Sequence, residues 1–192
     1  MSVIALPQRR PVLADRLATT RWADAVVVVA AAAFVGLLAQ ISVPLPHTPV
    51  PLTGQTLGVL VAGASLGTWR ATASMSLYVL AGLAGVPWFH SHTSGYPGVT
   101  FGYLVGFVVA AAVMGEMSRR GLDRHVGSAV AQFLVGSLVI YLFGVSWLAH
   151  SAHLSAAQAL AAGMKPFLVG DAIKALLAGA LLPAAWRLGG RS

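Results

Sequence analysis

The stretch that decides the fold is residues 23–43, which read ADAVVVVAAAAFVGLLAQISV. About 20 consecutive apolar residues form a helix long enough to cross the ~30 Å hydrocarbon core of a bilayer. The run is rich in Ala, Val and Leu and lacks the alternation of inward and outward residues that is typical of barrel strands. It is therefore predicted to be a transmembrane helix.

Similar runs follow along the whole chain. Hydrophobic residues make up 57% of the sequence and charged residues only 9%, whereas a soluble domain carries about 25% charged residues. We predict an all-α integral membrane bundle of six transmembrane helices, formed as one membrane domain over residues 1–192 with an N-terminal tail (1–22) and a bundle (23–186). The predicted spans are 23–43, 53–68, 71–85, 100–117, 126–148 and 166–186.

The second and third spans are shorter than a simple crossing requires. Gly54, Gly58, Gly63 and Gly67 recur through the second span, and small residues at such spacing allow helix backbones to approach closely. Both segments are predicted to be buried or tilted helices, with a re-entrant pair as the alternative.

Basic residues predict the orientation of the bundle. With the N-terminus inside, ten of the twelve Lys and Arg residues fall on the cytoplasmic side, while Lys165 lies outside and Lys174 lies within a span. Cytoplasmic loops of membrane proteins carry an excess of Lys and Arg, so both termini are expected in the cytoplasm. The basic residues stand at the ends of apolar runs, where they contact membrane lipid headgroups, and no nucleic acid is expected as a partner. The first run shows no cleavage site of a signal peptide.

The three predicted outer loops are 44–52, 86–99 and 149–165. They hold almost no charge, but they contain Pro, Gly, aromatic rings, hydroxyl groups and five of the six His residues. This composition is typical of structured, functional loops. We expect a solute site near the outer face.

Asp171 and Lys174 are the most informative residues of the chain. A charged side chain costs about 2.5–3.5 kcal/mol at the centre of a lipid-facing helix, so such residues usually face a cavity or a bundle interior. Their spacing of three residues places both on one face of the sixth span, in its outer half. Both are candidate substrate-binding residues; the alternative is an ion pair that fixes the helix to its neighbours.

Six further candidates for substrate binding are polar or aromatic side chains near the predicted outer face. The polar ones have capping or interhelical hydrogen bonding as their alternative role, and the aromatic ones an interfacial belt. These candidates are Thr53, Gln55, Tyr78, Trp88, Phe89 and Tyr103.

The sequence offers little that points to catalysis or to a bound metal. His90-Ser91-His92 and His150-Ser151-Ala152-His153 suggest a metal site, but the chain has no Cys and no carboxylate stands near these residues to complete a ligand set. The sequence contains no GxxxxGK[ST] or HExxH motif. We therefore expect neither an enzyme nor a resident cofactor or metal.

Five motifs between Pro51 and Lys174 resemble the BioY family, the biotin-specific substrate-binding components of energy-coupling factor (ECF) transporters, and the resemblance runs from about residue 25 to residue 186. Their order and spacing along the chain carry the resemblance. The motifs are Pro51-x-Thr53-x-Gln55-Thr56, Gly82-x-x-Gly85-x-Pro87-x-Phe89, Gly102-Tyr103-x-x-Gly106-Phe107, Tyr141-x-x-Gly144 and Gly163-x-x-Pro166-Phe167-x-x-Gly170-Asp171-x-x-Lys174.

The resemblance implies a protein of the prokaryotic cytoplasmic membrane that captures biotin outside and delivers it inward. It implies an ECF transmembrane coupling protein and two ABC-type ATPase subunits as partners. Ala32, Gly36 and Ala39 form a small-residue stripe that suits contact with a partner or packing within the chain. The alternatives are a carrier for another vitamin, a carrier that works without partners, and an intramembrane metal-dependent enzyme.

Overall fold

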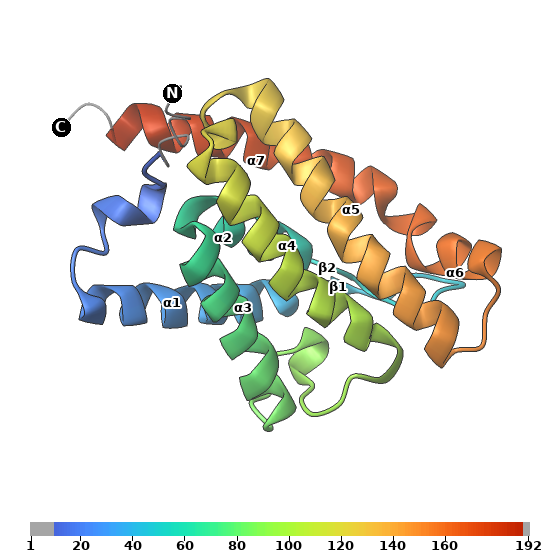
Figure 1. Cartoon of the computed structure of the whole chain (residues 1–192). Coiled ribbons are helices and arrows are strands. Elements are labelled where there is room, and N and C mark those ends of the chain that lie inside the picture. The colour runs from blue at the N-terminus through green and yellow to red at the C-terminus, as the bar shows by residue number, and fades with distance from the viewer. Residues whose placement is uncertain (1–9, 190–192) are drawn as a thin grey trace, which may run out of the picture.

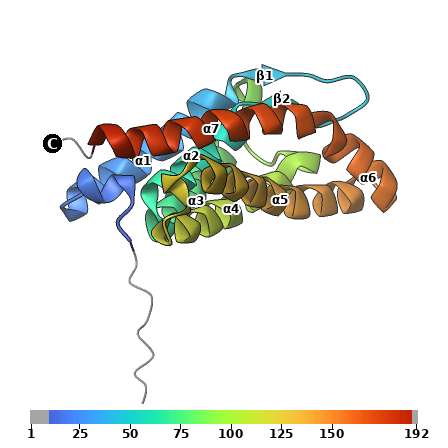
Figure 2. The same ribbon diagram turned by 90° about the horizontal axis from the view of Figure 1, so that it is seen from above.

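The computed structural model describes residues 10–189, so that Arg9 and Arg191 of the basic count lie outside the described residues. Helices pack side by side into an elongated bundle, with the described chain ends at one end and α6 at the other (Figures 1 and 2). The elements are α1 (Arg21–Ala39), β1 (Ser42–Val43), β2 (Leu52–Thr53), α2 (Gln55–Leu66), α3 (Thr68–Leu83), α4 (Phe101–Arg119), α5 (Val126–Ser151), α6 (Ala156–Gly163) and α7 (Leu168–Gly189).

The six predicted spans correspond to α1–α5 and α7, with ends that differ by a few residues. Within residues 10–189, four apolar segments are long enough to cross a membrane: Arg21–Ala39, Gly98–Arg119, Val126–Ser151 and Ala156–Leu188. The fold therefore has the predicted helical character.

Helix α2 is short because it lies inside the bundle. Eight of its twelve residues are buried, and it contacts α1, α3, α4 and α7. A Cβ atom on Gly63 would lie 2.7 Å from the Cβ atom of Met114 on α4, so the absence of a side chain permits this close approach. The prediction of a buried second helix is confirmed.

The small-residue stripe of α1 also faces the interior. Ala32, Gly36 and Ala39 are buried, and a Cβ atom on Gly36 would lie 3.1 Å from the Cβ atom of Trp88. The stripe thus packs within this chain, and the structure gives no support to its use as a contact with a partner.

The described chain ends meet at one end of the bundle, which we call the inner end. The guanidinium groups of Arg16 and Arg124 lie 4.9 and 4.2 Å from the ring centre of Trp186 on α7. The indole N–H of Trp186 donates to Asp123, 2.5 Å away. Both described ends thus lie at one end of the bundle, as an even number of crossings requires.

The opposite, outer end contains structure that the sequence analysis did not predict. The first outer loop begins and ends in an antiparallel ribbon that pairs β1 with β2, and the third contains α6, whose first turn is capped by Ser155 and Gln158. The hydroxyl group of Thr48 donates to the carbonyl oxygen of Ala162, 2.7 Å away. This bond ties the first loop to the third.

Candidate substrate-binding site

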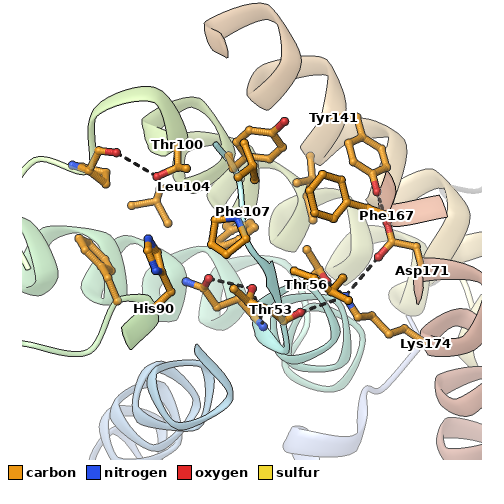
Figure 3. Close-up of a pocket in the computed structure, with 18 residues that line it drawn as sticks. Thr53, Thr56, His90, Thr100, Leu104, Phe107, Tyr141, Phe167, Asp171 and Lys174 are labelled. Atoms are coloured by element: carbon orange, nitrogen blue, oxygen red, sulfur yellow. Dashed lines mark hydrogen bonds and ion pairs between the residues drawn. The ribbon is translucent and has the colours of Figure 1, made fainter. Parts of the chain in front are cut away.

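A cavity lies at the outer end of the bundle, among the outer parts of α2, α4, α5 and α7 and the outer loops (Figure 3). It contains about 630 Å³ of space that no protein atom fills, including its opening to solvent. Six of the eight predicted site residues line it, although they come from distant parts of the sequence: Thr53, Gln55, Phe89, Tyr103, Asp171 and Lys174.

Asp171 and Lys174 reach this cavity from the beginning of α7. The ammonium nitrogen of Lys174 lies 3.3 Å from Oδ1 of Asp171. It also donates to the carbonyl oxygen of Thr53 and to Oγ1 of Thr56, at 3.0 and 2.6 Å. An ammonium group has three N–H donors, so these three acceptors account for all of them. Asp171 stands in the first turn of its helix, where the helix dipole stabilises a negative charge.

Tyr141 is a site residue that the candidate list omitted. Its hydroxyl group, on α5, donates to Oδ2 of Asp171, and both side chains line the cavity. A single hydroxyl group in an apolar span gives no sign of its partner, and here that partner lies thirty positions away in sequence. Only the family motif that contains Tyr141 offered a signal.

The beginning of α2 supplies polar groups that are bonded to one another. The hydroxyl group of Thr53 donates to Oε1 of Gln55 at 2.9 Å. The amide nitrogen Nε2 of Gln55 donates in turn to the hydroxyl oxygen of Tyr78 at 2.7 Å. Both Thr53 and Gln55 line the cavity, so this chain of hydrogen bonds fixes the orientation of the amide in the cavity wall.

Tyr78 and Trp88 do not line the cavity and lie behind its wall, in contrast to the predicted direct contact. Tyr78 is fully buried, and its hydroxyl group donates to the carbonyl oxygen of Trp88 at 3.2 Å. The indole N–H of Trp88 donates to the carbonyl oxygen of Tyr78 at 2.9 Å. Their polar groups thus hold the second outer loop against α3 and support Phe89, whose ring packs edge-on to that of Tyr78.

Aromatic and aliphatic side chains form most of the remaining wall. Tyr103 is anchored by a hydrogen bond of 2.7 Å from its hydroxyl group to the carbonyl oxygen of Gly163. Phe107, Phe167 and Ile140 continue this surface. A mainly apolar wall with a few fixed polar groups is typical of a binding site for a small organic molecule.

His90 lines the cavity as well. Burial lowers the pKa of its imidazole below the ordinary value of 6.5. Among residues 10–189, no three His, Cys, Asp or Glu side chains are grouped so as to hold a metal ion. The cavity wall thus presents an imidazole in addition to the carboxylate of Asp171.

A helix bundle with apolar spans and a cavity at one end is the arrangement expected of a membrane protein that binds a small solute. Residues 12–191 match the BioY family. The biotin transporter BioY of Rhizobium etli is 36% identical over 156 residues, which cover 76% of this chain and 82% of the relative. The probable biotin transporter BioY of Pyrococcus horikoshii is 38% identical over 143 residues, covering 73% and 82% of the two chains.

The fold has a counterpart among solved structures. The crystal structure of the S-component for biotin from an ECF-type ABC transporter superposes with a TM-score of 0.78, at 22% identity, over 91% of this chain and 96% of the other. The chain belongs to the BioY family, whose members are transporter components and not enzymes.

Proposed function

We propose that this protein is the substrate-binding membrane component of a biotin uptake transporter. Membership of the BioY family and relatives that are named biotin transporters support this function. The observation that carries it in this chain is the buried carboxylate of Asp171, which faces the cavity between Lys174 and Tyr141.

The chemistry of biotin suits this arrangement. Its fused ring system presents two ureido N–H donors and one carbonyl oxygen. An ionised carboxylate has about four lone-pair positions, and Lys174 and Tyr141 each use one on Asp171. The remaining positions accept from the ureido N–H groups in charge-assisted hydrogen bonds.

The other predicted residues have two kinds of role in this proposal. Phe89 and Tyr103 enclose the apolar part of the ligand, and Thr53 and Gln55 present polar groups beside it. Tyr78 and Trp88 act from behind the wall, because their hydrogen bonds orient Gln55 and the second outer loop. Tyr141 fixes the position of the Asp171 carboxylate.

Equilibrium binding of labelled biotin to the purified chain in detergent tests this function. We expect saturable binding that desthiobiotin displaces, because desthiobiotin retains the ureido ring, and that an unrelated vitamin leaves unchanged. Displacement by the unrelated vitamin but not by desthiobiotin would assign the cavity to another solute, which is the main alternative within the same architecture.

We also propose that the inner end of the bundle is cytoplasmic, in the inner membrane of a prokaryote. The excess of basic residues at that end supports this orientation. The chain has no native Cys, so single Cys residues at the exposed positions Ser94 and Arg120 report on the two ends. In intact cells, an impermeant maleimide should label Ser94→Cys and not Arg120→Cys; the reverse pattern would invert the topology.

Transport in this proposal requires an ECF transmembrane coupling protein and two ABC-type ATPase subunits. The sequence has no phosphate-binding loop, which supports a separate source of energy. The purified chain should bind biotin without ATPase activity. Concentrative uptake by liposomes that contain only this chain, without an ion gradient or ATP, would support the alternative of a carrier that works alone.

A further inference from the structure

His90 is held in the cavity wall by a well-bonded turn of the second outer loop. The amide nitrogen and the hydroxyl group of Thr93 both donate to the carbonyl oxygen of His90, at 3.2 and 2.8 Å. Gln40 of α1 fixes the same turn, since its Nε2 donates to the carbonyl oxygen of Phe89 and its Oε1 accepts from the backbone of His92. The backbone that carries the imidazole is therefore fixed from both sides.

The imidazole has a hydrogen-bonding group that the protein leaves unused. Its Nδ1 atom is buried and has no hydrogen-bond partner within residues 10–189. Buried polar atoms in native proteins nearly always have a partner, and an exception in a cavity wall points to a group that is supplied from outside the chain. Nδ1 is closed to solvent as the ring stands, but His90 lines the cavity, so rotation of the ring brings this nitrogen to a ligand there.

The distribution of charge in the cavity indicates which ligand atom this is. Among the described side chains that line it, only His90 and Lys174 can carry a positive charge. The three N–H groups of Lys174 are already bonded to Thr53, Thr56 and Asp171. His90 stands on the side of the cavity away from Asp171 and Lys174 (Figure 3). A ligand whose ring binds Asp171 thus extends its other end toward the imidazole.

We propose that His90 is a specificity-determining residue of this site and that its imidazolium form binds the carboxylate tail of the ligand while Asp171 binds the ureido ring. This inference rests on the proposed function. The protonated imidazole donates an N–H bond to the carboxylate, and the proton comes from the solvent. A ligand with a carboxylate is therefore preferred over one with a neutral tail.

A pH dependence of binding follows from this contact. Burial lowers the pKa of His90 in the empty site, and an adjacent carboxylate raises it. Binding therefore takes up a proton, and affinity rises as the pH falls. The other titratable groups of the cavity and its supporting elements are His92 on the same turn, Tyr78 on α3, Tyr103 on α4, Tyr141 on α5, and Asp171 and Lys174 on α7.

Binding measured by calorimetry at about pH 6 and about pH 8, which bracket the ordinary titration range of histidine, tests the inference. The ligands are biotin and biotinamide, whose tail is uncharged. The proteins are the full-length wild type, His90→Gln and His92→Gln. His92→Gln is the control, because His92 is exposed and does not line the cavity. One linked proton changes affinity by up to ~10-fold per pH unit. We expect biotin to bind wild type and His92→Gln about tenfold or more tightly at the lower pH, and His90→Gln and biotinamide to show no such change.

Each outcome separates this inference from the proposed function. Equal biotin affinity of the wild type at both pH values, or the same pH dependence in His90→Gln, would overturn the role of His90 and leave biotin binding intact. No biotin binding by the wild type at either pH would overturn both. The comparison of biotin with biotinamide on the wild type needs no variant, so it decides the matter even if His90→Gln does not fold.

Discussion

The two ends of this bundle each bury an acid–base cluster, and the clusters differ in what surrounds them. At the inner end, Arg70 of α3 lies 2.5 Å from Asp15 and 2.7 Å from Asp24, and its side chain is 8% exposed. At the outer end, Lys174 lies 3.3 Å from Asp171, and both line a cavity.

The inner cluster serves to close the bundle. Asp15 also receives a hydrogen bond from Arg119 at 3.3 Å, so one carboxylate joins the segment before α1 to α3 and α4. Val12 of the same segment is fully buried. The two clusters thus differ in one respect: the inner one joins segments of the chain, whereas the outer one also borders a cavity.

The largest expected effect is on stability, from Arg70→Met at the inner end. The substitution leaves Asp15 and Asp24 without their main partner, and removal of one member of a buried charge pair costs about 3–5 kcal/mol. Thermal unfolding in detergent should show a large loss of stability, while the folded fraction binds biotin with nearly unchanged affinity.

Arg120→Gln is the matched control at the same end. Arg120 pairs with Glu116 at 3.4 Å, but its side chain is 71% exposed, and exposed pairs contribute little because solvent screens them. If Arg70→Met were as stable as Arg120→Gln, the inner cluster would not hold the bundle together.

A smaller effect, on affinity instead of stability, is expected from Tyr141→Phe at the outer end. The change removes the hydrogen bond to Asp171 but keeps the ring. A hydrogen bond to a charged group contributes about 1.5–3 kcal/mol, so the dissociation constant for biotin should rise about tenfold or more. An unchanged dissociation constant in Tyr141→Phe would mean that Asp171 needs no such positioning.

Gly82→Ala should distort the cavity through its wall. A Cβ atom at Gly82 would clash with the ring of Phe89, and overpacking of this kind costs about 1–3 kcal/mol. We expect weaker biotin binding because Phe89 and the second outer loop must shift. In Gly127→Ala, on α5, the new methyl group meets no atom within 4 Å, and this control should bind like the wild type; equal binding by both variants would contradict the role of Phe89.

The smallest effect is expected on the pH dependence of stability, and it is seen in acid. Burial raises the pKa of Asp15, but hydrogen bonds from Arg70 and from the backbone of Val12, with the charge of Arg119, outweigh it and hold the pKa below 3.8. The unfolded chain therefore binds this proton first, so stability present above the ordinary pKa is lost as the pH falls through the folded-state pKa. Melting temperatures of the wild type should fall in acid more steeply than those of Asp15→Asn; equal slopes would contradict this linkage.

Much of the fold could be predicted because the six spans have long apolar runs or small-residue spacing, both of which are local signals. The outer loops could not. The ribbon of β1 and β2 has two residues in each strand, which is too short for a periodic pattern. Helix α6 has a signal in its capping box of Ser155 and Gln158, but its eight residues fall below the length of typical helices.

The site shows the same limit. Charges within a span are costly, so Asp171 and Lys174 stand out from sequence alone. An aromatic residue near a loop gives no indication of which way its ring points: Tyr103 lines the cavity, whereas Tyr78 turns its hydroxyl group toward Trp88. The contact of Tyr141 with Asp171 depends on the packing of α5 against α7, which no local pattern encodes.

The central claim is that Asp171, held in place by Lys174, binds biotin and that the pair does not merely join helices; a double-mutant cycle with labelled biotin tests it most directly. Asp171→Asn should weaken binding by about 1.5–3 kcal/mol, which is about tenfold to more than a hundredfold in the dissociation constant. Lys174→Met should also weaken binding, and the double variant should fold without an unpaired charge yet still bind poorly. A double variant that folds and binds biotin as tightly as the wild type would contradict the assignment of this site.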